Sequence, residues 1–227
     1  VIDRIESADG WVITADQFSQ YRVSTLSGTA GNDHINGTIG PNTVNAGSGD
    51  DVVHGSTGRD SLYGGYGNDV LYGDDGDDTL EDSEGINVLD GGAGNDGVYG
   101  SGYLSGSDGN DTLQGSGGGS VILDGGAGND TYQSPDQSAT IVFGRGSGND
   151  KVNGGQSYRI NTNVLAGEIE LSGGTVDGLI SPLTLRIVDT GETLTGIDGA
   201  AALVFADGTT WTAAEIAARA ILPEPVP

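Results

Sequence analysis

Aspartates recur at a fixed spacing over much of this 227-residue chain. From Gly28 to Tyr99 the sequence divides without a gap into nine-residue blocks, such as GGYGNDVLY and GGAGNDGVY, and the sixth residue of most blocks is Asp. Carboxylate oxygens are ligands for hard cations. The formal net charge is −25, with only 8 Lys and Arg residues, so cations are the partners that this chain favours.

The same charge excludes several classes of partner. Nucleic acids require dense Lys and Arg, so no nucleic acid partner is expected, and acidic polysaccharides and anionic membranes are disfavoured for the same reason. The chain has no Cys, which excludes disulfides and thiolate metal sites. It has no apolar run long enough to span a bilayer and no leader-like segment, so we expect no direct membrane insertion. Met is absent and the chain begins at Val1, which favours a piece of a longer polypeptide.

Each block also has one apolar residue, at position eight, and a glycine at position four. A period of nine with a single apolar position does not fit an amphipathic helix, whose apolar stripe recurs every three or four residues. It fits a tight turn followed by a very short strand, and glycine allows the positive φ angles that such a turn requires. The apolar residues at position eight are Ile35, Val44, Val53, Leu62, Leu71, Leu80, Leu89, Val98, Leu113, Tyr132 and Val152.

Further copies follow at 106–114, 125–133 and 145–153. Together the blocks resemble the G-G-x-G-x-D-x-U-x repeat of RTX (haemolysin-type) calcium-binding proteins, in which U is a large apolar residue. The resemblance covers roughly half of the chain, and so many copies in phase make it specific. It implies an all-β fold, a right-handed parallel β-roll in which two blocks make one coil, and several bound calcium ions.

One turn supplies too few oxygens for calcium, which takes six to eight. The resemblance implies that each ion lies between two stacked turns, bound by the position-six residues of both and by carbonyls from positions one to four. The candidate position-six ligands are Asp33, Asp51, Asp60, Asp69, Asp78, Asp96, Asp111, Asp130, Asp150, Asn42 and Asn87. The candidate glycines are Gly31, Gly47, Gly49, Gly58, Gly65, Gly67, Gly76, Gly92, Gly94, Gly109, Gly126 and Gly128.

Alternate turns then form two edges of the roll. The first edge holds Asp33, Asp51, Asp69 and Asn87, and the second holds Asn42, Asp60, Asp78 and Asp96. Two-carboxylate sites are expected at 33/51, 51/69, 60/78 and 78/96. The pairs 42/60 and 69/87 each contain an Asn, so we expect them to bind more weakly or to stay empty.

The later turns fit this spacing less well. Asp111 and Asp130 lie 19 residues apart instead of 18, so a bulge is needed to pair them. Asp150 has no preceding turn at the expected spacing.

A disordered acidic linker is the alternative explanation of these aspartates. The fixed phase between Asp at position six and an aliphatic residue at position eight argues against it, because a linker has no reason to keep that phase. Without calcium, however, stacked acidic turns repel one another and the core is thin. Calcium binding should therefore contribute free energy of folding.

The sequence after about residue 154 changes character and ends in LVFADGTTWTAAEIAARA. Asp207 and Gly208 predict a hairpin turn. Thr212 and Glu215 predict a capping box, with Trp211 and Ile216 as its hydrophobic staple, at the start of a short helix over about 213–220. This segment resembles the haemolysin-type calcium-binding-related domain that often follows RTX repeats, and we expect 154–227 to be a β-rich capping domain after a β-roll at 28–153.

The N-terminus repeats this ending. IESADGWVITADQF at 5–18 aligns without gaps on LVFADGTTWTAAEI at 203–216. Thr14 and Gln17 predict a second capping box, with Ile13 and Phe18 as its staple. We therefore expect residues 1–27 to be the hairpin and helix of a preceding unit, so that adjacent modules of the same chain are partners.

No catalytic set is found: the carboxylates fall at repeat positions that explain them as ligands, and there is no nucleophile elbow. The module is therefore not expected to be an enzyme. We expect a calcium-binding module of a larger bacterial protein, secreted unfolded by type I secretion to the extracellular medium or the cell surface. The parent protein could be an adhesin, a toxin or an exoenzyme. The alternative is a substrate-holding repeat module of a secreted polysaccharide-modifying enzyme, with a glycan or a surface as partner.

Overall fold

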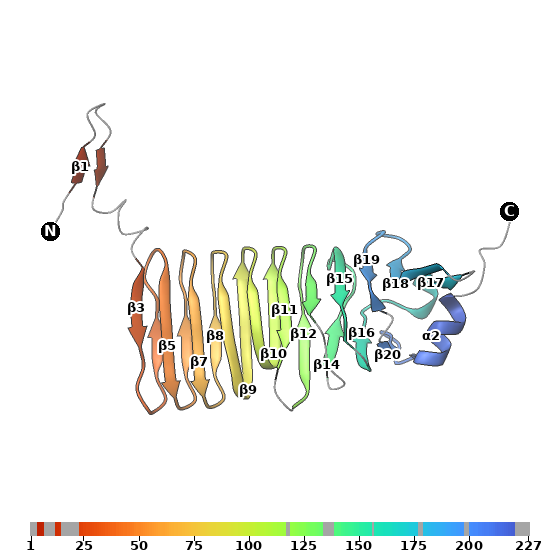
Figure 1. The fold of residues 1–227 in the computed structure, drawn as a ribbon, viewed down its shortest axis with the longest axis horizontal. Coiled ribbons are helices and arrows are strands. Elements are labelled where there is room, and N and C mark those ends of the chain that lie inside the picture. Colours follow the sequence, from red (N-terminus) through yellow and green to blue (C-terminus); the bar gives the residue numbers. More distant parts are fainter. Residues whose placement is uncertain are drawn as a thin grey trace.

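The computed structural model describes residues 4–6, 12–14, 23–116, 119–133, 139–155, 157–176, 179–197 and 200–220. Its main body is a parallel β-solenoid in which short strands stack side by side along one axis (Figure 1). Strands from alternate blocks pair in parallel at an interval of 18 residues, as in Val44 with Leu62 and Val53 with Leu71. This confirms the predicted β-roll with two blocks to each coil.

Two sheets form the walls of the solenoid. The first contains β3 (Ser24–Ser27), β5 (Asn42–Ser48), β7 (Ser61–Tyr66), the first halves of β9 (Thr79–Ala93) and β10 (Gly97–Asp108), β11 (Thr112–Gly115), β13 (Thr131–Gln133) and β15 (Asn149–Asn153). The second contains β4 (His34–Asn36), β6 (Val52–His54), β8 (Val70–Tyr72), the second halves of β9 and β10, β12 (Val121–Asp124), β14 (Ala139–Val142) and β16 (Tyr158–Asn161).

The core between the two sheets contains a row of position-eight side chains. Val44, Val53, Leu62 and Leu71 come from alternate sheets, and each is fully buried. Tyr132 occupies the same position further along, and its hydroxyl donates to the carbonyl of Val142 at 3.2 Å. Each block therefore contributes one large apolar side chain, and the hydrophobic stabilisation of a coil is small.

The position-four glycines allow the turns to form and to stack closely on one another. Gly67 has φ 136° and Gly76 has φ 152°, angles that residues with a side chain rarely adopt. A Cβ on Gly67 would collide with the carbonyl of Gly49, the equivalent glycine of the neighbouring turn. Glycine is required here for two reasons, the backbone angle and the close stacking of turns.

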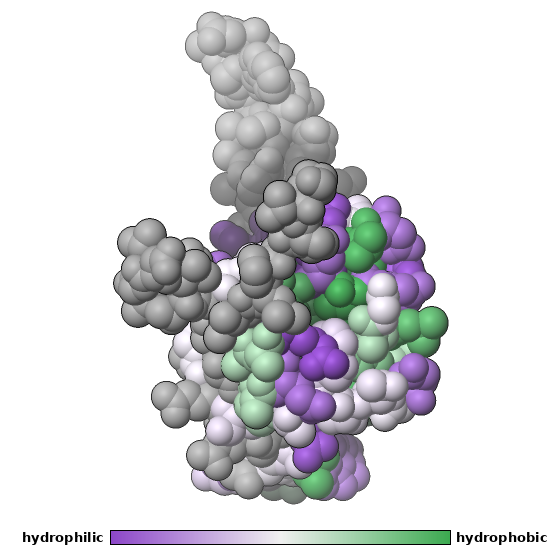
Figure 2. Space-filling view, turned by 90° about the vertical axis from the view of Figure 1, so that its right-hand side faces the viewer, coloured by the Kyte–Doolittle hydropathy of each residue, from purple (hydrophilic) through white to green (hydrophobic). Residues whose placement is uncertain are grey.

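The C-terminal segment continues both sheets and then closes them. It contains η1 (Ala166–Glu168), β17 (Ile169–Val176), β18 (Leu179–Ile187), β19 (Thr193–Thr195), β20 (Ala200–Val204), β21 (Thr210–Thr212) and α2 (Ala213–Ala220). Strand β19 pairs in parallel with β15, and β20 pairs in parallel with β16. The remaining pairs, β17 with β18, β18 with β19 and β20 with β21, are antiparallel. Figure 2 views this end and shows hydrophobic and hydrophilic residues side by side on the described surface.

The predicted hairpin and helix start are present at this end. Gly208 has φ 81° in the turn between β20 and β21. The backbone N–H of Thr212 donates to Glu215 Oε2 at 2.8 Å, and that of Glu215 donates to Thr212 Oγ1 at 3.4 Å, which are the two bonds of a capping box. Trp211 and Ile216 are both buried in the core that this helix covers.

At the other end of the chain, β1 (Arg4–Glu6) and β2 (Val12–Thr14) form an antiparallel pair. The second capping box that the sequence predicts, with Gln17 and Phe18, lies outside the described residues. No helix in the described part of the chain has the length and apolar character needed to cross a membrane.

Candidate calcium sites

The position-six residues of each edge form a ladder of hydrogen bonds. On the first edge, the backbone N–H of Asp33 donates to Asp51 Oδ1 at 2.7 Å, and that of Asp51 donates to Asp69 Oδ1 at 2.7 Å. The N–H of Asp69 donates to Asn87 Oδ1 at 2.9 Å. From the second turn onward, one side-chain oxygen of the position-six residue is thus bound by the backbone of the turn before it.

The ladder of the second edge is longer. It runs through Asn42, Asp60, Asp78, Asp96, Asp111, Asp130 and Asp150, with N–H to Oδ1 distances of 2.6 to 2.9 Å. Asp150 has no preceding turn at an interval of 18 residues, but it joins the ladder at an interval of 20, because the backbone N–H of Asp130 donates to its carboxylate. Asp96 and Asp111 also pair, at an interval of 15 residues that the 18-residue spacing does not predict.

Changes in turn length explain these irregular intervals. In the sheets, the pairing of β9 with β10 shifts between Gly100 and Gly102, so the turn there is three residues shorter than in a full block. This turn lies on the first edge, and it shortens the interval between Asp96 and Asp111 without disturbing the second edge. The interval before Asp150 is longer because two additional residues enter the turn between the pairs Asp124–Val142 and Thr131–Lys151.

The second oxygen of these carboxylates has no partner. Eight of the ladder aspartates are at most 3% exposed, and the Oδ2 atom of each is buried without a hydrogen bond; they are Asp51, Asp60, Asp69, Asp78, Asp96, Asp111, Asp130 and Asp150. Burying a carboxylate oxygen without a partner is costly. A bound cation between the turns would remove that cost.

Burial raises the pKa of these groups. The pKa of Asp78 and of Asp96 is raised to about 7, and that of Asp150 to about 8, with removal from water as the largest cause. The hydrogen bond from the preceding backbone N–H lowers each pKa in part. Without a cation, these carboxylates would therefore retain protons at a pH at which exposed aspartates are ionised.

Asn42 shows which oxygens surround the position of the cation. Its Nδ2 donates to the carbonyls of Gly40 at 2.7 Å, Thr38 at 3.0 Å and Gly55 at 3.2 Å, and to Asp60 Oδ1 at 2.9 Å. These oxygens come from positions two and four of its own block, from position one of the next block on that edge, and from the next carboxylate. Carbonyl and carboxylate oxygens are the ligands that calcium prefers.

In the other turns this position holds a carboxylate oxygen, which in its ionised form has no proton to donate. The equivalent oxygens then face an acceptor, and a cation is the partner that satisfies all of them. The residues present thus fit calcium. At 42/60, in contrast, the amide already binds these oxygens.

The first turn of the first edge is closed by a threonine. The backbone N–H and the hydroxyl of Thr29 donate to Asp33 Oδ2 at 2.6 and 2.9 Å. The Oδ2 atom of Asp33 therefore has two hydrogen-bond donors, whereas that of each of the eight buried aspartates has none. Thr38 makes the same pair of bonds to Asn42 Oδ1 at 3.1 and 2.9 Å.

Side chains alone do not form a metal centre in the described residues, where no three of His, Asp and Glu converge on one point. Backbone carbonyls must supply much of any coordination shell. The predicted glycines Gly49, Gly58, Gly67, Gly76 and Gly94 lie in the stacked turns with positive φ. Asp82, a buried residue at position one, where most blocks have glycine, is not among the ligands predicted from the sequence.

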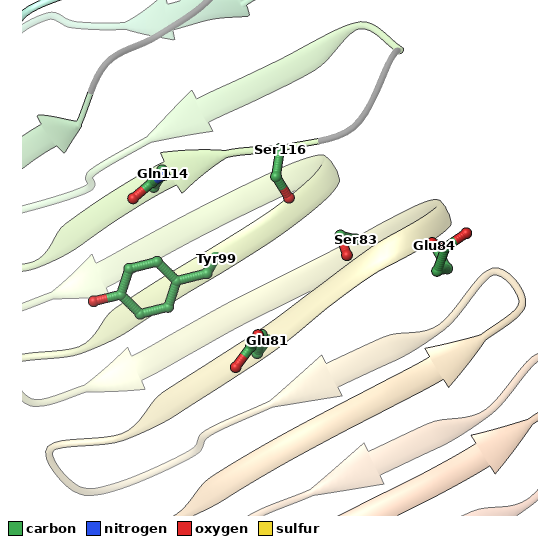
Figure 3. A pocket seen from close by; sticks show the side chains of 6 residues that line it. All are labelled: Glu81, Ser83, Glu84, Tyr99, Gln114 and Ser116. Carbon is green, nitrogen blue, oxygen red and sulfur yellow. The ribbon is translucent and has the colours of Figure 1, made fainter.

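A surface hollow of about 650 Å³ lies over β9, β10 and β11 (Figure 3). Glu81, Tyr99 and Gln114 occupy neighbouring positions on these three strands. Ser83, Glu84 and Ser116 complete the lining.

Comparison with known proteins identifies the repeats. A sequence profile described as the RTX calcium-binding nonapeptide repeat matches the chain four times, at residues 27–61, 45–80, 72–102 and 105–133. None of the curated proteins compared with the chain matches it. Among solved structures, the extracellular lipase LipA from Serratia marcescens is similar, with a TM-score of 0.37 and 18% sequence identity. The match covers 86% of this chain and 39% of the lipase chain.

Proposed function

Since residues 27–133 carry four copies of the RTX calcium-binding nonapeptide repeat, we propose that this β-roll folds when calcium fills the sites between its stacked turns. The proposed ligands are the ladder aspartates together with carbonyls of positions one, two and four. The larger protein is secreted by bacteria, by type I secretion, and the module acts in the extracellular medium or on the cell surface. It is a binding and folding module of an adhesin, toxin or exoenzyme and has no catalytic role of its own.

One observation carries the proposal. Eight buried carboxylates each have an oxygen without a partner, and in the turn where Asn42 replaces Asp, an N–H₂ group donates to the oxygens at that position. A positive or proton-donating group is therefore what these turns require. Calcium supplies it for several turns at once.

The same geometry explains why folding depends on the ion. The chain has a formal net charge of −25, and its ladders place carboxylates at sheet spacing, roughly 4.8 Å apart. A core of one large side chain for each block offsets little of that repulsion. Sites of extracellular type, with Kd of about 10⁻⁴–10⁻³ M, would remain without calcium in the cytosol and fill outside the cell.

Circular dichroism during a calcium titration tests the proposal. We expect β-structure to appear cooperatively with calcium, no such change with magnesium at the same concentration, and loss of the signal on addition of a chelator. Magnesium is the control because it requires a smaller octahedral site and retains its water. A β-roll that is fully formed in chelator at neutral pH would contradict the proposal.

The hollow in Figure 3 favours a second function, the holding of a neutral glycan by the module of a polysaccharide-modifying enzyme. A tyrosine ring beside carboxylate and amide groups offers an apolar face and hydrogen-bond partners for sugar hydroxyls. Glycan binding with and without calcium tests it, with Tyr99→Ala as the variant that should abolish binding. Absence of binding by the calcium-loaded wild type would exclude this second function.

A further inference from the structure

The block at 82–90, DSEGINVLD, departs from the repeat at two positions that matter for metal binding. Position six is Asn87 instead of Asp, which removes a carboxylate from the first edge. Position one is Asp82, where most of the other blocks have glycine. The two exceptions occur in the same block, on the turn that stacks on the turn of Asp69.

Asn87 does not close its site in the way that Asn42 does. Its Oδ1 faces the Asp69 turn and accepts the N–H of Asp69 at 2.9 Å. Its Nδ2 donates to Ser101 Oγ at 3.1 Å, and to the carbonyls of Asp82 and Glu84 at 3.3 and 3.4 Å. None of these acceptors is the carboxylate of Asp69, whose Oδ2 has no hydrogen-bond partner.

The side chain of Asp82 reaches back into the same space. Asp82 is 3% exposed, and its Oδ2 is also buried without a hydrogen bond. A Cβ placed on Gly64 would collide with Asp82 Oδ2 and lie 2.7 Å from Asp69 Oδ2, so the two orphaned oxygens converge on one point beside Gly64. Asp82 Oδ1 is fixed by the backbone N–H of Glu84 at 3.2 Å.

We propose that Asp82 is a calcium ligand and that the site between the turns of Asp69 and Asn87 holds an ion. The site offers two carboxylates, from Asp69 and Asp82, and the amide oxygen of Asn87. Its formal charge is therefore the same as that of a site with two position-six aspartates, although one carboxylate comes from position one. This inference rests on the proposed calcium binding of the repeats and reverses the expectation that 69/87 is weak or empty.

Two variants test the role of Asp82. Asp82→Gly restores the residue that most blocks have at position one, and Asp82→Asn retains the shape of the side chain while removing its charge. Native mass spectrometry and isothermal titration calorimetry with calcium chloride at neutral pH would give the number of ions bound by each chain. We expect one ion fewer in both variants than in the wild type.

Glu81→Gln is the matched control, because Glu81 is the adjacent acidic residue but is exposed on the strand surface. It should bind as many ions as the wild type. An unchanged ion count in both Asp82 variants, each checked for folding in calcium by circular dichroism, would overturn the inference and leave the other sites intact. A wild type that binds no calcium would instead overturn the proposed function itself.

Discussion

The two edges of the solenoid differ in how their stacked turns continue and how their ladders end. On the second edge, a ladder of position-six residues runs without interruption from Asn42 to Asp150. On the first edge, the ladder that begins at Asp33 ends at Asn87, and the next turn is shortened at Gly100–Gly102. In that short turn, Ser101 Oγ accepts a hydrogen bond from Asn87 Nδ2 and donates to the carbonyl of Gly85 at 2.8 Å.

This difference shows that the buried oxygens of stacked turns need partners, which hydrogen-bond donors supply where the ladders end. Thr29 closes the first turn of one ladder and Thr38 that of the other, while Ser101 ends the first edge with a hydroxyl. Neutral hydrogen-bond donors satisfy the oxygens at the ends of the ladders, where few oxygens face one another. In the middle of a ladder each turn presents a carboxylate and carbonyls, which a hydroxyl cannot satisfy.

The largest effect is expected from Asp78→Ala, in the middle of the second edge. Asp78 accepts the N–H of Asp60, and its own N–H donates to Asp96, so it contributes to two proposed sites. Two lost ions correspond to about 5 kcal/mol of unfolding free energy when calcium is about 100-fold above Kd. Denaturant unfolding in calcium measures this. Asp75→Ala, an exposed position-three residue of the same turn, is the control and should change little.

A gain of one ion is expected from Asn42→Asp. The substitution replaces the donating amide by a carboxylate and gives the 42/60 pair the composition of the other second-edge sites. Ion counting by native mass spectrometry should show one more calcium than in the wild type, with about 2.7 kcal/mol of added stability at the same calcium excess. Asn45→Asp, at an exposed strand position, should leave the count unchanged. An unchanged count for Asn42→Asp would mean that the amide does not mark the position of the ion.

The pH dependence should have opposite signs with and without calcium. The pKa of Asp78 is raised to about 7 and that of Asp150 to about 8, above the value of about 3.9 in an unfolded chain. The folded state without calcium therefore binds more protons than the unfolded state, and its stability should fall as pH rises from about 4 to about 8. With calcium, protons compete for the same oxygens, so affinity should rise over that range. Circular dichroism at pH 5 and pH 8, in chelator and in calcium, compares the two; the same sign in both would contradict the assignment.

The smallest effect is expected from Ser101→Ala at the end of the first edge. The substitution leaves the carbonyl of Gly85 and one hydrogen of Asn87 without their partner, which costs about 1–3 kcal/mol. The number of bound ions should not change, because the hydroxyl stands where no carboxylate is present. Ser83→Ala, at an exposed position in the preceding turn, is the control. A lost ion in Ser101→Ala would mean that calcium extends beyond Asn87.

Much of the fold could be predicted because each nine-residue block carries the residues that determine its own turn and strand. One apolar residue and one glycine for each block fix the strand and the turn, and the parallel solenoid follows from stacking them. The pairing of Asp96 with Asp111 could not be predicted from spacing on one edge, since the missing residues lie at Gly100–Gly102 on the other edge. The pairing of Asp130 with Asp150 was hidden by two additional residues in the turn between them. The partners of the two asparagines could not be predicted either: Asn42 Nδ2 donates to the carboxylate of Asp60, whereas Asn87 Nδ2 donates to Ser101 Oγ. Asp82 could have been found from the sequence, because it is one of the few residues other than glycine at position one of a block.

The 18-residue coil also has a consequence for length. A coil advances the solenoid by one strand spacing, roughly 4.8 Å, whereas the same residues fully extended would reach about 60 Å. Coiling therefore shortens the reach of this stretch more than tenfold. If calcium governs that transition, a module held at both ends would convert a change in calcium concentration into a change of distance between the points it connects.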